Sequence, residues 1–289
     1  MSYSSDEKTE YDEPSSDYYS DSDGMEYASN NYLLDAIRNN DIVAIETLID
    51  SGIEIRPIEF STAVKLGNLD VIRTLLYNGA IISFNDLLFV ITRGFEEIVR
   101  EFIDSGMNIN QEIGRALEST VYINDQTKRL NILEALLFAG AQDPEGTALE
   151  LHATFNDNDI ESVSLILEYL TYTPEQLKTV INEAISSGHL QIAFEVALYL
   201  NDDTILNDMI SNQQFNLDQN SFRAAIRLER PDIALRIAVM MRSFALVRHL
   251  FDDLEYQAGP EAIEIGLLAG RLNLPDIEEY ILSRVEMLP

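Results

Sequence analysis

Apolar residues recur at spacings of three and four along residues 33–110, in a block of 27 residues that occurs three times. The blocks align on Gly52, Gly79 and Gly106. In every block the positions sixteen, seven, four and three before the glycine, and three after it, are apolar. Apolar side chains at this spacing lie on one face of an α-helix. Each block therefore predicts short amphipathic helices.

Two helices fit each block, with a turn between them near Asn40, Gly67 or Gly94. The aligned glycine at the end of the block predicts a left-handed cap on the second helix. A single pair of short helices cannot cover its own apolar face, so repeats of this length indicate stacked pairs. The pattern predicts an all-α solenoid.

Two stretches carry a resemblance to a known family. The segment AVKLGNLDVIRTLLYNGA, residues 63–80, resembles the two-helix core of an ankyrin repeat, and AISSGHLQIA, residues 184–193, resembles it again. GMNIN, residues 106–110, is similar to the usual end of that repeat. The Thr-Pro-Leu-His opening of the family is missing, and the period is 27 rather than about 33. The resemblance therefore implies short-period repeats whose β-hairpin fingers are reduced to tight loops.

The pattern continues beyond the third block. Gly106 and Gly140 are 34 residues apart, and seven extra residues are expected between two helices, at 122–128. Further helical stretches are predicted at 204–212, 221–229, 232–241, 243–254, 260–272 and 275–285. We expect an ankyrin-like solenoid of about eight helix pairs over residues 33–289, with clear repeats in 33–200 and divergent repeats and a C-terminal cap in 201–289.

Residues 1–32 have a different composition. They contain no Leu, Ile, Val or Phe, and nine acidic residues against one lysine. Such a segment cannot bury enough apolar surface to offset its ordering entropy. We expect a disordered acidic tail rich in Ser, Tyr and Asp. Two roles beyond an entropic tail stay open: phosphorylation at Ser20 or Ser22, and autoinhibition by folding onto a basic surface.

Charge narrows the choice of partner. The chain has 50 Asp and Glu against 19 Lys and Arg, a net charge of −31 at neutral pH. This balance repels phosphate backbones and anionic membranes, so we expect a protein partner, with a basic protein as one candidate, and neither direct nucleic-acid nor membrane binding. The chain has no cysteine and no apolar signal segment at its start. We expect a cytoplasmic, intracellular protein, and a viral or bacterial protein acting in a host cell fits the same features.

No catalytic or metal-binding motif stands out. His152, His189 and His249 lie far apart and lack metal-ligand spacing. The His189 side chain is expected to form a hydrogen bond with the backbone at a turn. The segment NDNDIE, residues 156–161, lacks the Gly and distal Glu of an EF-hand and predicts a helix N-cap instead. We therefore expect no enzymatic activity, no cofactor and no metal ion.

The resemblance implies that first helices line a concave face and second helices a convex one. Arg38, Lys65 and Arg93 would form a basic column on the concave face, with Leu66 and Phe89 as apolar anchors. The candidate partner-binding residues there are Asp35, Arg38, Thr62, Lys65, Leu66, Phe89, Thr92 and Arg93. The candidate acidic convex surface comprises Asp41, Glu46, Asp50, Glu97, Glu101 and Asp104.

Two functions fit these features. The preferred one is a non-enzymatic scaffold or inhibitor that binds a partner protein through the solenoid surface. The alternative is an acidic nucleic-acid mimic that occupies the basic groove of a nuclease, a restriction enzyme or another DNA- or RNA-binding protein. Mimicry predicts steep salt dependence and competition with DNA, which a scaffold does not. The oligomeric state stays open.

Overall fold

A computed structural model describes residues 32–155, 159–212 and 215–286 of the chain. These residues are largely helical and contain no strand, which confirms the all-α prediction. No helix within them combines the length and the apolar character that crossing a membrane requires. Apart from Tyr32, the predicted acidic tail lies outside the described residues, and so do its candidate phosphorylation sites Ser20 and Ser22.

The chain divides into two compact units, residues 1–81 and residues 82–289. The first unit contains a helix at residues 32–38, then α2 (Ile42–Asp50), α3 (Pro57–Leu66) and α4 (Leu69–Tyr77). Helix α4 packs against both α2 and α3. Five of the residues that the 27-residue pattern aligns are buried in the core of this unit: Ala36, Ile45, Ala63, Ile72 and Leu75. The other aligned residues of the unit are half-buried: Leu48, Ile49, Ile55 and Leu76.

The second unit contains fourteen α-helices and one π-helical turn among its described residues. In chain order they are α5 (Phe84–Thr92), α6 (Glu96–Asp104), α7 (Arg115–Thr120), α8 (Gln126–Phe138), α9 (Thr147–Phe155), α10 (Ile160–Tyr169), α11 (Pro174–Ser186), α12 (Leu190–Leu200), α13 (Asp203–Ser211), α14 (Gln219–Arg227), α15 (Pro231–Met240), α16 (Phe244–Arg248), η1 (His249–Asp253), α17 (Glu261–Arg271) and α18 (Pro275–Glu286).

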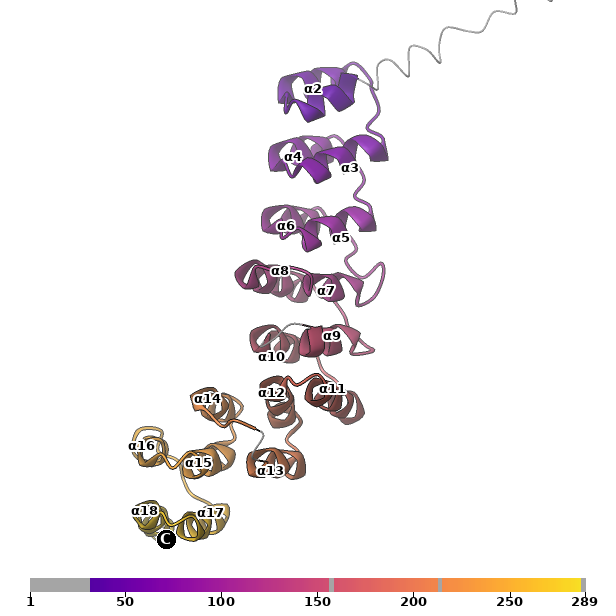
Figure 1. The fold of residues 1–289 in the computed structure, drawn as a ribbon. Coiled ribbons are helices and arrows are strands. Elements are labelled where there is room, and N and C mark those ends of the chain that lie inside the picture. Colours follow the sequence, from indigo (N-terminus) through magenta and orange to yellow (C-terminus); the bar gives the residue numbers. More distant parts are fainter. Residues whose placement is uncertain (1–31, 156–158, 213–214, 287–289) are drawn as a thin grey trace, which may run out of the picture. The chain divides into compact units, whose positions relative to one another are not determined.

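Two rows of helices pass through the first half of this unit. Helices α5, α7, α9 and α11 contact one another in turn, and so do α6, α8, α10 and α12. Each first-row helix also contacts the second-row helix that follows it (Figure 1). Beyond α12 the pairing changes, because α12 contacts both α13 and α14, and α15 contacts α13, α14 and α17. Each of these helix pairs therefore packs against the next pair along the chain.

Local sequence signals begin and end these helices. Gly52, Gly79 and Gly106 have positive φ angles of 97°, 90° and 80°, which confirms the predicted left-handed caps. A reciprocal capping box formed by Ser83 and Asp86 starts α5. In α3 the Arg56 backbone N–H donates to the fully buried Glu59 at 3.0 Å. The loop at residues 51–56 contains no strand.

The seven extra residues predicted at 122–128 are arranged differently from a projecting loop. The connection between α7 and α8 covers only residues 121–125, and residues 126–128 form the first turn of α8. Val121 and Ile123 are buried, so this connection turns into the core. The helices predicted beyond residue 200 are present, with the stretch at 243–254 divided into α16 and η1.

The left-handed glycine caps generate a stability prediction. An L side chain in this backbone region costs about 1–2 kcal/mol, and asparagine tolerates it best. Nothing lies within 4 Å of a Cβ built on Gly106, so the cost of a substitution is conformational. We expect Gly106→Ala to lower the free energy of unfolding in urea by about 1–2 kcal/mol and Gly106→Asn by about half of that.

The chain offers its own precedent for the asparagine control, because Asn40, Asn201 and Asn273 have φ angles of 57°, 59° and 57°. Equal losses in the two Gly106 variants would contradict the conformational origin of the cost.

Candidate functional site

The five predicted concave residues of the first unit differ in whether their side chains are free to contact a partner. Arg38 Nη1 lies 3.3 Å from Asp35 Oδ1, so these two exposed residues pair with each other. The Thr62 hydroxyl donates to the Ile58 carbonyl in its own helix at 2.6 Å. Lys65 is exposed and has no ion-pair partner among the described residues, and Leu66 is 53% exposed. Lys65 and Leu66 therefore stay available for a partner.

The predicted concave residues of the second unit lie together at the end of α5. The Arg93 guanidinium carbon is 5.4 Å from the centroid of the Phe89 ring, and Phe95 packs edge-on against that ring at 6.4 Å. The Thr92 hydroxyl bonds the Leu88 carbonyl at 3.0 Å. Phe89 is thus partly covered by its own neighbours. Arg38 and Lys65 belong to one unit and Arg93 to the other, so the basic column stays a prediction.

The predicted acidic residues lie mainly at the surface of second helices. In the first unit Asp41, Glu46 and Asp50 are exposed, and Asp41 also caps α2 by accepting the Ala44 N–H at 3.0 Å. In the second unit Glu97 and Asp104 are exposed on α6, while Glu101 is half-buried. Helices α8 and α10 follow α6 in the same row and add three exposed acids: Glu134, Glu161 and Glu168. We call the exposed residues Glu97, Asp104, Glu134, Glu161 and Glu168 the acidic row.

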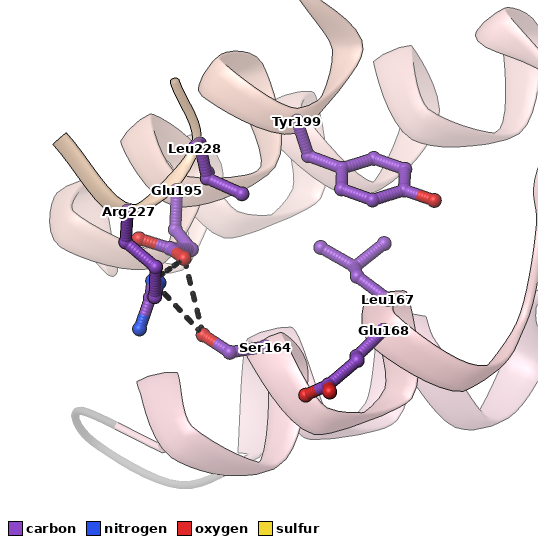
Figure 2. A pocket seen from close by; sticks show the side chains of 7 residues that line it. All are labelled: Ser164, Leu167, Glu168, Glu195, Tyr199, Arg227 and Leu228. Carbon is purple, nitrogen blue, oxygen red and sulfur yellow. Dashed lines mark hydrogen bonds and ion pairs between the residues drawn. The ribbon is translucent and has the colours of Figure 1, made fainter. Parts of the chain in front are cut away.

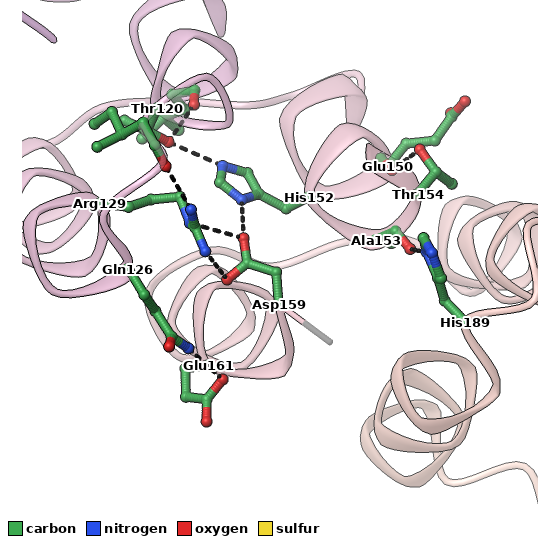
Figure 3. A network of polar contacts seen from close by, with 12 residues as sticks. Thr120, Gln126, Arg129, Glu150, His152, Ala153, Thr154, Asp159, Glu161 and His189 are labelled. Carbon is green, nitrogen blue, oxygen red and sulfur yellow. Dashed lines mark hydrogen bonds and ion pairs between the residues drawn. The ribbon is translucent and has the colours of Figure 1, made fainter. Parts of the chain in front are cut away.

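Four buried polar residues form a network that the sequence did not predict (Figure 3). His152 is fully buried, with its Nδ1 3.0 Å from Asp159 Oδ2 and its Nε2 2.9 Å from Thr120 Oγ1. The Arg129 Nη2 donates to Asp159 Oδ1 at 3.2 Å, and its Nε lies 3.1 Å from Oδ2 outside hydrogen-bond geometry. Arg129 also donates to the Ile123 carbonyl. The network joins α7, α8, α9 and the start of α10.

The order of atoms in this network is that of a hydrolase triad: hydroxyl, imidazole and carboxylate. Thr120 is fully buried, however, and its hydroxyl is 2.7 Å from the Leu117 carbonyl as a donor. A substrate therefore cannot reach it. Asp159 occupies the N-cap position of α10, as the sequence predicted, but its side chain makes no capping bond and faces His152 and Arg129 instead. The network ties two helix pairs together.

The network controls the ionisation of Asp159. Burial alone would raise the pKa of this carboxyl group, but the hydrogen bond to His152 and the charge of Arg129 outweigh it and hold the pKa below its ordinary value. A folded-state pKa below the unfolded one means that the ionised form stabilises the fold. The stabilisation by ionised Asp159 is fully present at pH values well above the ordinary aspartate pKa. It is lost as the pH falls through the pKa that Asp159 has in the folded protein.

The pKa of a second buried carboxylate, Glu195, is shifted in the opposite direction. Glu195 is 4% exposed, and its Oε1 accepts the Ser164 hydroxyl at 3.1 Å and pairs with Arg227, whose side chain is 54% exposed. Burial raises the pKa of Glu195, and the partly solvated Arg227 and the Ser164 bond offset it incompletely. The difference from Asp159 lies in the partners, because Arg129 and His152 are themselves buried.

Glu195 lines two pockets of about 350 Å³ each between α10, α12 and α14. The first also contains Leu167, Glu168, Tyr199 and Leu228 (Figure 2). The second lies beside it and is lined by residues that include Glu161, Gln191, Phe194 and Arg223. Ser164, Glu195 and Arg227 line both, so their interaction separates two halves of one groove.

The two histidines outside the buried network, His189 and His249, each contact an oxygen atom of the protein. His189 Nδ1 lies 2.9 Å from the Ala153 carbonyl, which confirms the predicted backbone role. His249 lies 2.7 Å from Asp253 at the surface. No group of three or more His, Asp or Glu side chains among the described residues could hold a metal ion.

The buried network predicts an acid-sensitive stability. Asp159→Asn leaves Arg129 buried without its counter-ion, and we expect a loss of about 3–5 kcal/mol in the free energy of unfolding at neutral pH. Because the wild-type advantage depends on ionised Asp159, the difference between the two proteins should shrink at about pH 3. Urea unfolding at the two pH values measures both. A loss that is equal at both values would contradict the role of ionised Asp159.

Glu195→Gln is the matched control, since it also removes one buried carboxylate from an arginine pair. Arg227 stays half in water, so we expect a change within about 1 kcal/mol at neutral pH. A loss as large as that of Asp159→Asn would show that exposure of the cationic partner does not set the cost.

Comparison with protein-family models, with curated proteins and with solved structures finds no match to this chain. Similarity therefore assigns no activity to its residues. The proposals that follow rest on the helices, their packing and their charges.

Proposed function

We propose that this protein is a non-enzymatic scaffold or inhibitor that binds a partner protein through the surface of an ankyrin-like solenoid. The observation that carries the proposal is the acidic row: helices α6, α8 and α10 contact one another in turn, and each presents exposed carboxylates. Stacked helix pairs generally provide extended surfaces for binding proteins. The two helix rows and the strand-free loop before α3 favour a solenoid with reduced fingers.

The chemistry of the row favours a basic partner. Its carboxylates belong to a chain with a net charge of −31, and such a field attracts cationic proteins and accelerates their association. The hydroxyl–histidine–carboxylate arrangement at Thr120 is closed to substrate, which favours binding over catalysis. Lys65 and Leu66 on α3 are also exposed and offer a partner one cationic and one apolar contact.

The same row supports the alternative of a nucleic-acid mimic, because carboxylates spaced along neighbouring helices can occupy a groove that binds phosphates. The two functions differ in their response to salt. Contacts made by charge alone weaken steeply as ionic strength rises, whereas buried apolar contacts persist.

The test compares two variants that remove equal charge from the full-length chain. One carries Glu97→Gln, Asp104→Asn and Glu134→Gln in the acidic row, and the control carries Glu264→Gln, Asp276→Asn and Glu279→Gln on α17 and α18. Partners are captured from cell lysate at about 100 mM and about 500 mM salt, with and without DNA. We expect a partner that is captured less at about 500 mM than at about 100 mM salt but is not released, ignores DNA, and is lost only with the first variant.

Partners that are released by both salt and DNA would favour the mimic. Equal capture by the two variants would contradict binding through the acidic row.

A further inference from the structure

We propose that the pocket beside Glu195 binds an arginine side chain of the partner, whose guanidinium pairs with Glu195 and Glu168 and whose stem contacts Leu167, Tyr199 and Leu228. This inference rests on the proposed function, because it names a site and a chemical preference for the partner.

The pocket has an apolar end and a charged end. Figure 2 shows Tyr199 and Leu167 facing each other at one end and the group of Ser164, Glu195 and Arg227 at the other. Its volume of about 350 Å³ accommodates a long side chain. An arginine is amphipathic in the same sense, with an apolar stem and a cationic head, and its guanidinium stacks on aromatic rings. The pocket thus offers matching surfaces to both parts.

The charged end has an unused acceptor. Both hydrogen bonds of Glu195 reach Oε1, and Oε2 accepts none from a described residue. Glu195 as a whole is only 4% exposed, but its Oε2 is not enclosed, so a second cationic donor in the pocket could reach this oxygen. Glu168 is exposed on α10 and has no ion-pair partner within the described part of the chain. The pocket therefore combines a buried and an exposed carboxylate.

The charge around the groove selects a cation over an anion. Three carboxylates and two guanidiniums line the two halves: Glu161, Glu168, Glu195, Arg223 and Arg227. An anionic ligand would face three carboxylates around the groove, and one of the two guanidiniums, that of Arg227, is already paired with Glu195. A guanidinium adds donors and leaves the Arg227 pair intact. The acidic row includes Glu161 and Glu168, so the pocket lies on the surface that attracts basic partners.

The experiment is a titration of the full-length protein, followed by the methyl resonances of Leu167 and Leu228. The probe is N-acetyl-arginine methylamide, and its neutral isostere N-acetyl-citrulline methylamide is the control ligand. We expect saturable shifts at both leucines with a dissociation constant of about 1 mM, and binding of the citrulline amide that is at least about tenfold weaker.

Protein variants locate the binding. Glu195→Gln should weaken the arginine amide about tenfold and Glu168→Gln about threefold, while Glu97→Gln, which removes an acid of the row outside the pocket, should leave it unchanged. Equal binding of the arginine and citrulline amides would overturn the proposal. So would equal weakening by Glu97→Gln, because it would show attraction by diffuse charge alone.

The outcomes separate this inference from the function on which it rests. If the leucine methyls do not respond while partner capture still depends on the acidic row, the pocket is wrong and the scaffold stands. If the arginine amide binds while no partner is captured, the scaffold is wrong and the pocket stands.

Discussion

The structure depends on one constraint: helices of about ten residues cannot cover their own apolar faces. Ile45 and Ile72 in the first unit, and Val99 in the second, are fully buried although each lies on a helix of nine residues. In the second unit the contacts of α6 with α8, and of α8 with α10, provide the covering surface. Burial of apolar side chains by the neighbouring pair contributes about 1.5–3 kcal/mol for each large residue, so adjacent pairs stabilise one another.

Buried polar groups in this fold require hydrogen-bond or ion-pair partners, and the burial of those partners decides the direction in which the pKa of a carboxylate shifts. Asp159 and Glu195 are both buried carboxylates beside an arginine, yet the pKa of the first is lowered and that of the second is raised. Arg129 is buried together with Asp159, whereas the Arg227 side chain is half exposed. The buried pair of Asp159 and Arg129 stabilises the fold. The pair of Glu195 and Arg227 leaves a carboxylate incompletely compensated beside an open pocket, which is the kind of place where a ligand gains affinity.

The helices and their ends could be predicted from the sequence because both arise from local physics. The spacing of apolar residues indicated the helices, and the aligned glycines required backbone conformations that other residues avoid. The buried network could not be predicted, because Thr120, Arg129, His152 and Asp159 belong to four separate helical elements. Glu195 left one signal, a lone charge within the apolar run of residues 192–200. The contact of Arg93 with Phe89 was also missed, since a sequence pattern does not show which exposed side chains cover each other.

Hydrogen exchange on the full-length Asp159→Asn variant tests most directly whether neighbouring helix pairs stabilise one another. Its amide protection is compared with that of the wild-type protein in each helix. Packing by adjacent pairs predicts that exchange accelerates most in α7, α8, α9 and α10, which the network joins, and least in α17 and α18. An equal acceleration in all helices of the second unit would contradict this account, because it would show that the unit opens only as a whole.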